Sequence, residues 1–151
     1  MGAGNQQERL DPNWITGFID GEGCFHVAIS KLQKMTLGWQ VLPEFRVVQH
    51  QRDIDMLYQL QSYFGLGNVV KNHGDRQEFR VRGAKNLEKI TTFFKKYPLM
   101  TKKSQDFEIF CTVLEMMKRK EHLTQHGLEK IAQLASKMNR KVRRSRILRD
   151  Y

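Results

Sequence analysis

The chain has 151 residues and carries 26 lysines and arginines against 16 aspartates and glutamates, which gives a formal net charge of +10. This length predicts one domain, and an apolar fraction of 40% is enough to form a hydrophobic core. The charge favours nucleic acid, an acidic protein or anionic lipid as a partner, and lipid is the weakest of the three because no basic segment carries a strong aromatic face. The two cysteines exclude a disulfide framework, and no apolar run is long enough to cross a membrane.

The sequence predicts a helix and then a strand after residue 11. Asp11 followed by Pro12 is a typical helix start, because the aspartate side chain caps the first turn and proline suits the first helical position. The glycines of the run 21–23 end this helix. Residues 24–30 then alternate in polarity, which predicts a strand with one wet face. Its inward positions are Phe25, Val27 and Ile29, and its outward positions are Cys24, His26, Ala28 and Ser30.

A second strand, a helix and two short strands are predicted next. The strand over residues 39–49 contains Pro43, which indicates an edge position or a bulge because proline has no amide hydrogen to donate. Asp53 begins the following helix, and Gly65 closes it. The last two strands lie on either side of a turn at residues 72–75, so each of the two strand pairs precedes a helix.

Three helices complete the predicted fold, over residues 87–97, 101–120 and 124–138. The middle helix carries an apolar stripe that is expected to face the core. Its members are Phe107, Phe110, Cys111, Leu114 and Met117. The order αββαββα, followed by further helices, predicts an α+β fold in which helices cover one face of a four-stranded antiparallel sheet.

The uncovered face of this sheet is expected to mix hydrogen-bond donors with acceptors. A merely solvated face has the same alternation, but the net charge favours DNA, because a β-ribbon fits the major groove and its side chains meet base edges. The polar residues expected on this face are His26, Ser30, Gln40, Glu44, Arg46, Lys71, Arg76, Glu78 and Arg80.

Residues 15–23 form the nine-residue motif I-T-G-F-I-D-G-E-G at the end of the first helix. Gly17 and Gly21 lie four apart on one helix face, where small residues let a second helix approach closely. Glu22 follows at the helix end, and Asp20 is expected to have a structural role there, with metal binding as the alternative. If the partner is a copy related by a two-fold axis, two Glu22 carboxylates come together and repel each other unless a divalent cation lies between them. An isolated D-G-E-G sequence would instead be explained as an exposed acid in a helix stop.

This motif resembles the signature of the LAGLIDADG homing endonucleases, and the αββαββα order agrees with that family's core over about residues 12–120. The resemblance implies a site-specific endonuclease that cuts both strands of a long, near-palindromic DNA duplex and leaves 3′ overhangs. One copy of the motif implies a homodimer, with Gly17, Phe18 and Gly21 at its interface. An intron maturase acting on RNA and a non-catalytic DNA-binding regulator are the alternatives on the same fold.

The resemblance also assigns a catalytic set. Glu22 and the backbone carbonyl of Gly21 would bind Mg²⁺, with Mn²⁺ as a substitute and Ca²⁺ binding without turnover. Glu22 departs from the aspartate that is most frequent in the family. Gln49 would orient the attacking water, and Lys102, with Lys103 as the competing choice, would stabilise charge on the phosphate. The alternative without a catalytic role is that Gln49 is a polar residue at a strand end and that Lys102 is a lysine at the start of a helix.

Base recognition falls, by the same resemblance, to the uncovered sheet face. Arginine binds guanine in bidentate fashion, glutamine pairs with adenine and glutamate accepts from cytosine. Guanine is therefore assigned to Arg46 and Arg80, adenine to Gln40, and cytosine to Glu44 and Glu78. A basic segment after the last helix is expected to bind phosphates without reading sequence: Asn139, Arg140 and Lys141.

The chain is expected to divide into an N-terminal extension (1–11), an endonuclease domain (12–138) and a basic tail (139–151). The first eleven residues show no secretion signal and no transit pattern. Secretion and membrane association are therefore not expected. The resemblance implies an intron-encoded product of a chloroplast or mitochondrion, or a protein of the bacterial cytoplasm.

Overall fold

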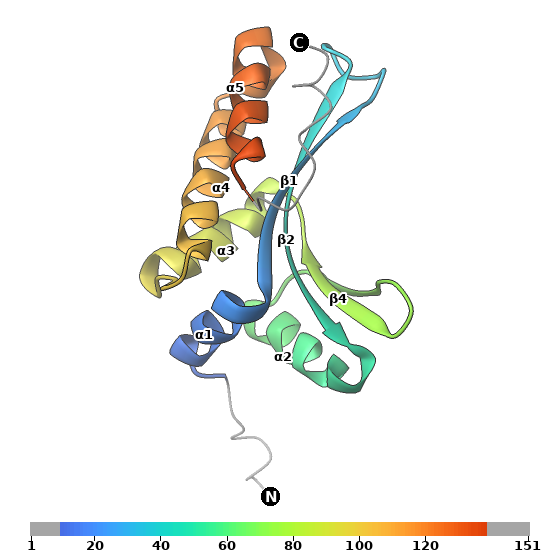
Figure 1. The fold of residues 1–151 in the computed structure, drawn as a ribbon, viewed down its shortest axis with the longest axis vertical. Coiled ribbons are helices and arrows are strands. Elements are labelled where there is room, and N and C mark those ends of the chain that lie inside the picture. The colour runs from blue at the N-terminus through green and yellow to red at the C-terminus, as the bar shows by residue number, and fades with distance from the viewer. Residues whose placement is uncertain (1–9, 139–151) are drawn as a thin grey trace, which may run out of the picture.

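Five α-helices and one four-stranded sheet make up residues 10–138, the part of the chain that the computed structural model describes (Figure 1). The elements are α1 (Pro12–Glu22), β1 (Gly23–Lys31), β2 (Trp39–His50), η2 (Gln51–Asp53), α2 (Ile54–Phe64), β3 (Asn68–Lys71), β4 (Arg76–Val81), α3 (Ala84–Lys96), α4 (Lys103–Lys118), η3 (Glu121–Leu123) and α5 (Gln125–Ser136). Their order confirms the predicted αββαββα core followed by further helices. No helix within residues 10–138 is both long enough and apolar enough to span a membrane.

The sheet has the strand order β1-β2-β4-β3, and every neighbouring pair is antiparallel. The two outer strands, β1 and β3, belong to two hairpins that meet where β2 pairs with β4. Pro43 pairs with Val27 of β1, but β4 begins to pair with β2 only at Phe45. The prediction of an edge position at Pro43 is confirmed, because β2 has no second neighbour at that point.

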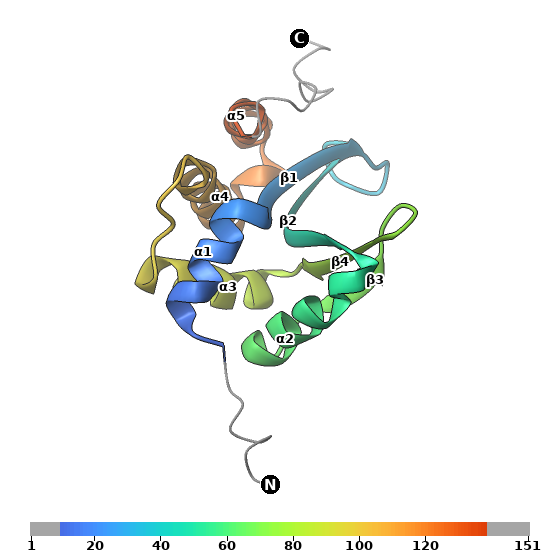
Figure 2. The same cartoon turned by 60° about the horizontal axis from the view of Figure 1, so that its bottom comes forward.

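Helices cover one face of the sheet and leave the other face open (Figure 2). The core between them centres on Phe25 of β1, which is 1% exposed. Four rings surround it with centroid distances of 5.1 to 5.8 Å: Phe45, Phe94, Phe107 and Phe110. These aromatic contacts fix the helices α3 and α4 against β1 and β2, and so fix the position of α1, which leads directly into β1.

The buried stripe of α4 differs from the predicted one. Its buried residues are Phe107, Phe110, Val113 and Met116, which follow a three-residue spacing. Three predicted members are only half-buried and pack against the margin of the core: Cys111, Leu114 and Met117. That part of the prediction was wrong because helical spacing alone does not fix how far a helix is rotated about its axis.

Candidate functional site

Helix α1 is held against the rest of the fold by one face. The Asp11 carboxylate accepts hydrogen bonds from the amides of Asn13 at 2.7 Å and Trp14 at 3.3 Å, which caps the first turn as predicted. Ile15 and Ile19 are fully buried. The hydroxyl of Thr16 donates to the carbonyl oxygen of Tyr97 at 2.9 Å, which ties α1 to the end of α3.

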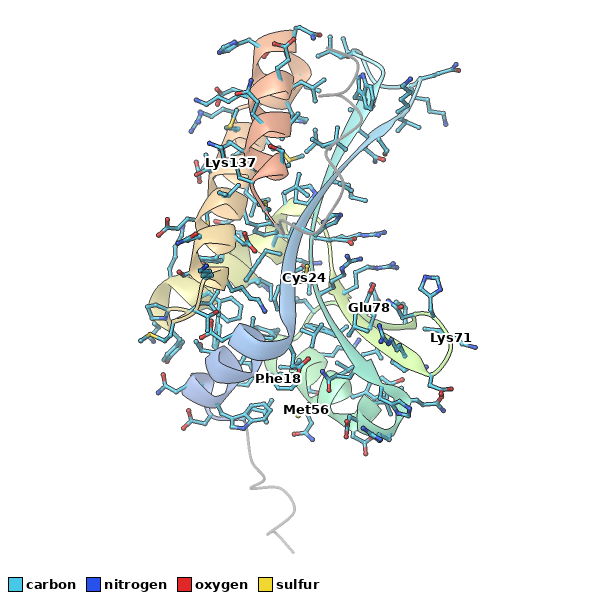
Figure 3. All side chains as sticks on the ribbon, in the orientation of Figure 1. Phe18, Cys24, Met56, Lys71, Glu78 and Lys137 are labelled. Carbon is cyan, nitrogen blue, oxygen red and sulfur yellow. The ribbon has the colours of Figure 1, made fainter. Side chains whose placement is uncertain are left out.

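Another side of α1 is largely open, with Trp14, Gly17 and Gly21 exposed and Phe18 partly buried against the core. We call this the α1 outer face, and it consists of Trp14, Gly17, Phe18 and Gly21. The rings of Trp14 and Phe18 stack with centroids 5.1 Å apart and planes 10° apart, and Trp14 is 46% exposed (Figure 3 labels Phe18). A Cβ atom built at either Gly17 or Gly21 meets no heavy atom within 4 Å. The α1 outer face is therefore apolar, and the helix backbone is accessible at Gly17 and Gly21.

The end of α1 and the start of α4 bind each other reciprocally, and Asp20 provides one half of this contact. Its carboxylate accepts hydrogen bonds from the amide of Met100 at 2.9 Å, and from the amide and hydroxyl of Thr101 at 3.1 and 2.8 Å. Partial burial acts to raise the pKa of Asp20, but these hydrogen bonds and nearby Lys103 outweigh it and lower the pKa below its ordinary value. Asp20 thus has the structural role that the sequence predicted.

Lys103 provides the other half of the contact. Its ammonium donates to the carbonyl oxygens of Ile19 at 2.9 Å and Asp20 at 3.1 Å, which are among the last carbonyls of α1. Burial lowers the pKa of Lys103, and four nearby groups oppose that shift by favouring the charged form: Cys24, Asp20, Asp106 and Glu22. The ammonium is therefore fixed at the tip of α1, within electrostatic range of Glu22.

The structure separates the two candidate lysines. Helix α4 begins at Lys103, and Lys102 precedes it as an exposed N-cap residue. The first turn of α4 directs Lys103 toward α1, so the residue that the sequence ranked second is the one that reaches the site. The structure thus favours Lys103 over Lys102, since sequence spacing did not fix the orientation of the first turn, and the catalytic role of either lysine stays a prediction.

Strand register relates Glu22 to Gln49. Gly23, which follows Glu22, pairs with Val47 in the antiparallel β1–β2 ladder, and Gln49 lies two residues further along β2. The Gln49 amide nitrogen donates to the carbonyl oxygen of Val48 at 2.9 Å. Glu22 is exposed. Lys103 therefore lies at the tip of α1 that carries Glu22, and the catalytic roles of Glu22, Gln49 and the lysine stay predictions.

Residues 10–138 contain no group of three or more histidine, cysteine, aspartate or glutamate side chains that could hold a metal ion. The tip of α1 offers the Glu22 carboxylate and the Gly21 carbonyl, which has no amide partner four residues on within the helix. Both are hard oxygen donors of the kind that Mg²⁺ and Ca²⁺ prefer. The donor type fits such an ion, but one chain supplies too few donors to enclose it.

The open face of the sheet carries most of the polar residues predicted for it. Strand register places His26 opposite Glu44, Ser30 opposite Gln40 and Arg46 opposite Arg80. Arg76 lies on the same face of β4 as Arg80 and pairs with His50. Burial and the charge of Arg46 lower the pKa of His26, while Glu44 opposes that shift, so the imidazole is mainly neutral near pH 7.

Lys71 does not share this face, so its predicted placement there was wrong. It pairs with Gln77, and strand alternation places both on the side of Val69 and Phe79, which the helices cover. Figure 3 shows Lys71 at the outer end of the β3–β4 hairpin. The turn between the two strands sets the register of β3, and the polarity of so short a strand did not reveal it.

Glu44 and Glu78 are on the open face but are only 5% exposed each. Both carboxylates are bound within the chain, Glu44 by Arg46 and Arg82, and Glu78 by Arg80 and Asn72. The assignment of these two residues to cytosine is therefore not supported, because both side chains are buried and held by partners within the chain. Arg82 was absent from the predicted contacts, although its alternation with Val81 was a sufficient signal. The predicted phosphate contacts Asn139, Arg140 and Lys141 lie outside the described residues.

The fold and the site define a LAGLIDADG-type protein, with an acid at the tip of an open helix face beside a polar sheet. Residues 15–114 match the family model described as LAGLIDADG endonuclease, and the chain belongs to this family. The crystal structure of the homing endonuclease I-TnaI has 54% sequence identity with the chain and a TM-score of 0.85, over 87% of this chain and 90% of that one.

Two further relatives extend the comparison. I-SmaMI, whose structure was solved bound to an uncleaved DNA target in the presence of calcium ions, is 41% identical with a TM-score of 0.84, over 87% of this chain and 45% of that one. "Probable intron-encoded endonuclease 3" of Neurospora crassa is 32% identical over 138 residues, which are 89% of this chain and 26% of that protein. The chain spans about a quarter of the length of the curated relatives that it matches first.

Proposed function

We propose that this chain is a homing endonuclease, which binds a long, near-palindromic DNA duplex as a homodimer and cuts both strands by metal-dependent phosphodiester hydrolysis, leaving 3′ overhangs. The observation that carries the proposal is the position of Glu22. It is an exposed carboxylate at the tip of a helix whose backbone is accessible at Gly17 and Gly21, next to the fixed ammonium of Lys103. Family membership and the DNA-bound state of I-SmaMI support the proposal.

The homodimer follows from the α1 outer face. Trp14 and Phe18 present a stacked aromatic surface, and Gly17 and Gly21 leave the helix backbone accessible. A second copy of the same face, related by a two-fold axis, would bury the aromatic rings and let the helix axes approach closely. The same two-fold axis brings the two Glu22 carboxylates together. The dimer then offers twice the number of oxygen donors for a metal ion that one chain supplies.

Each subunit's residues then have separate tasks. Glu22 and the Gly21 carbonyl would hold a divalent cation, taken to be Mg²⁺, with Mn²⁺ as a substitute and Ca²⁺ binding without turnover. A bound cation supplies Lewis-acid stabilisation of the charge that develops on the phosphate. Gln49 orients the attacking water through its side-chain amide. Lys103 takes the role predicted for Lys102 and places a fixed positive charge beside the phosphate.

DNA binding is assigned to the open face of the sheet, with the basic segment at Asn139, Arg140 and Lys141 holding the phosphate backbone. We further propose that residues 12–138 form the endonuclease domain, with an extension at 1–11 and a tail at 139–151. An organelle is the proposed location, since the curated relatives include the protein encoded in ND4 intron 1 of Podospora anserina.

Glu22→Gln tests the proposal with the full chain. The purified protein is incubated with a randomised duplex library, with and without Mg²⁺, and the products are sequenced. The wild type is expected to produce Mg²⁺-dependent double-strand cuts at a family of related sites, whereas Glu22→Gln retains binding to those sites and loses cleavage.

Glu88→Gln is the matched control, because Glu88 is an exposed acid on α3 and the substitution changes the charge equally. Equal loss of binding and cleavage in Glu22→Gln would contradict the metal-binding role. Absence of Mg²⁺-dependent cleavage by the wild type would refute the endonuclease. Specific binding without cleavage would then favour a regulator, and preferential binding of intron RNA a maturase.

A further inference from the structure

Two buried carboxylates lie among the arginines of the open sheet face, and neither has a part in the catalytic set. Glu44 and Glu78 are 5% exposed although strand alternation points them away from the helices. Burying an ionised carboxylate is costly unless charged or hydrogen-bonding partners replace the lost water. Both residues therefore need partners, and the partners are residues suited to reading DNA.

Glu44 binds one arginine with each carboxylate oxygen. Its Oε1 lies 3.3 Å from Nη1 of Arg46, and its Oε2 accepts a hydrogen bond from Nε of Arg82 at 2.8 Å. The side chains of Arg46 and Arg82 remain 35% and 43% exposed. Each guanidinium is thus anchored on one edge and keeps other N–H groups directed to solvent, since arginine has five donors in a planar arrangement.

Glu78 makes the corresponding contacts on β4. Its Oε2 lies 3.8 Å from Nη1 of Arg80, and its Oε1 accepts from the side-chain amide of Asn72 at 3.0 Å. Arg80 is directly opposite Arg46 in the β2–β4 ladder, a pairing of like charges that is unfavourable by itself. The carboxylates of Glu44 and Glu78 lie on either side of the two arginines and offset the repulsion between them. Both guanidinium groups can therefore stay side by side at the centre of the open face.

We propose that Glu44 and Glu78 are positioning residues for base recognition. Their negative charge weakens the electrostatic attraction of the face for any DNA, and the arginines that they hold discriminate better between sequences. An arginine anchored by a carboxylate presents a fixed pair of donors to the major-groove edge of guanine, whereas an unanchored arginine can turn to the nearest phosphate. The buried acids also lower the positive charge of the face without themselves reaching DNA. This inference rests on the DNA binding proposed above.

The test compares the full-length wild type with Glu44→Gln, Glu78→Gln and the control Glu88→Gln. A target is selected from a randomised duplex library with the wild type, and dissociation constants are measured for that target and for an unrelated duplex at one salt concentration. Both sheet variants are expected to bind the unrelated duplex at least as tightly as the wild type, because each loses a negative charge. The ratio of the two dissociation constants is expected to fall by between about fivefold and a hundredfold, the contribution of one bidentate base contact.

The expected loss of discrimination is confined to a few base pairs at equivalent positions in the two half-sites, which a merely destabilised sheet would not produce. Glu88→Gln is expected to leave the ratio unchanged. Asn72→Ala, which removes only the amide that binds Glu78, provides a milder test if a glutamine variant does not fold, with a smaller loss at the same base pairs. An unchanged ratio in the folded variants refutes the positioning role alone, whereas failure of the wild type to select any sequence refutes the proposed function and this inference together.

Discussion

Replacing Gly17 with leucine is expected to stabilise the isolated chain while preventing its assembly. Gly17 lies in the middle of α1, is exposed, and has no heavy atom within 4 Å of the position of an added Cβ. Glycine inside a helix costs about 0.5–1 kcal/mol relative to a good helix former. A leucine at this position gains that amount without a clash, which raises the melting temperature of a chain of this size by about 1–4 °C.

The same side chain acts in the opposite direction in the proposed dimer. Leucine at Gly17 would project into the partner's α1 and separate the stacked surfaces of Trp14 and Phe18. Overpacking costs about 1–3 kcal/mol per site, and the two-fold axis applies it twice, which gives about 2–6 kcal/mol. This weakens dimerisation from about thirtyfold to more than ten-thousandfold. Cleavage should be lost with it, since the two Glu22 carboxylates no longer meet.

Sedimentation velocity over a concentration series measures the dimer dissociation constant, and thermal unfolding is recorded at concentrations where the wild type is monomeric. Thr92→Leu is the control, because it places the same side chain on the exposed surface of α3. A Gly17→Leu chain that dimerises as tightly as the wild type would refute the assignment of the α1 outer face. A lowered melting temperature of the Gly17→Leu monomer would refute the conclusion that the space around Gly17 is open within one chain.

Two further predictions concern the contact between α1 and α4. Asp20→Ala removes three hydrogen bonds to Met100 and Thr101 and is expected to lower the free energy of unfolding by about 1–2 kcal/mol. The pKa of Asp20 is lowered in the folded chain, so the difference in unfolding free energy between wild type and Asp20→Ala is complete above the ordinary aspartate pKa of 3.8 and shrinks as the pH falls below it. Urea unfolding of both proteins at pH 6 and pH 3 measures this change. Lys103→Met is expected to slow single-turnover cleavage by about 10²–10³ with DNA affinity nearly unchanged, whereas Lys102→Met affects cleavage much less. The reverse order of the two lysines would contradict the site as described.

Local signals in the sequence were enough to predict the elements that carry the site. Asp11 and Pro12 set the start of α1, and the left-handed conformation of Gly65, with φ of 68°, ends α2 as expected. Alternation of polar and apolar residues identified the two faces of β1 and β2, because a strand with one covered face repeats every two residues. Each of these signals acts within a few residues, so no knowledge of the tertiary structure was needed.

The predictions that failed depended on contacts between distant segments. Choosing between Lys102 and Lys103 required the orientation of α4 relative to α1, which packing of the whole core determines. Placing Lys71 required the register of β3 against β4. The binding of Glu44 by Arg82 joins residues 38 positions apart, and no pattern in either strand indicates that both carboxylate oxygens are occupied. Residue type predicted which side chains are polar, but only the packing decided which of them are exposed on the open face of the sheet.

Helix α1 breaks a local rule at its functional end, and that exception is informative. The C-terminal end of a helix carries partial negative charge and disfavours acids, yet α1 ends with Asp20 and Glu22 and has no basic residue in its last turn. The fold compensates with Lys103, whose ammonium binds the exposed carbonyls, while Asp20 is used to anchor the start of α4. Glu22 remains exposed at this end, with the ammonium of Lys103 within electrostatic range. An exposed carboxylate beside the partial negative charge of a helix C-terminus favours binding of a further cation, which is what the proposed metal site requires.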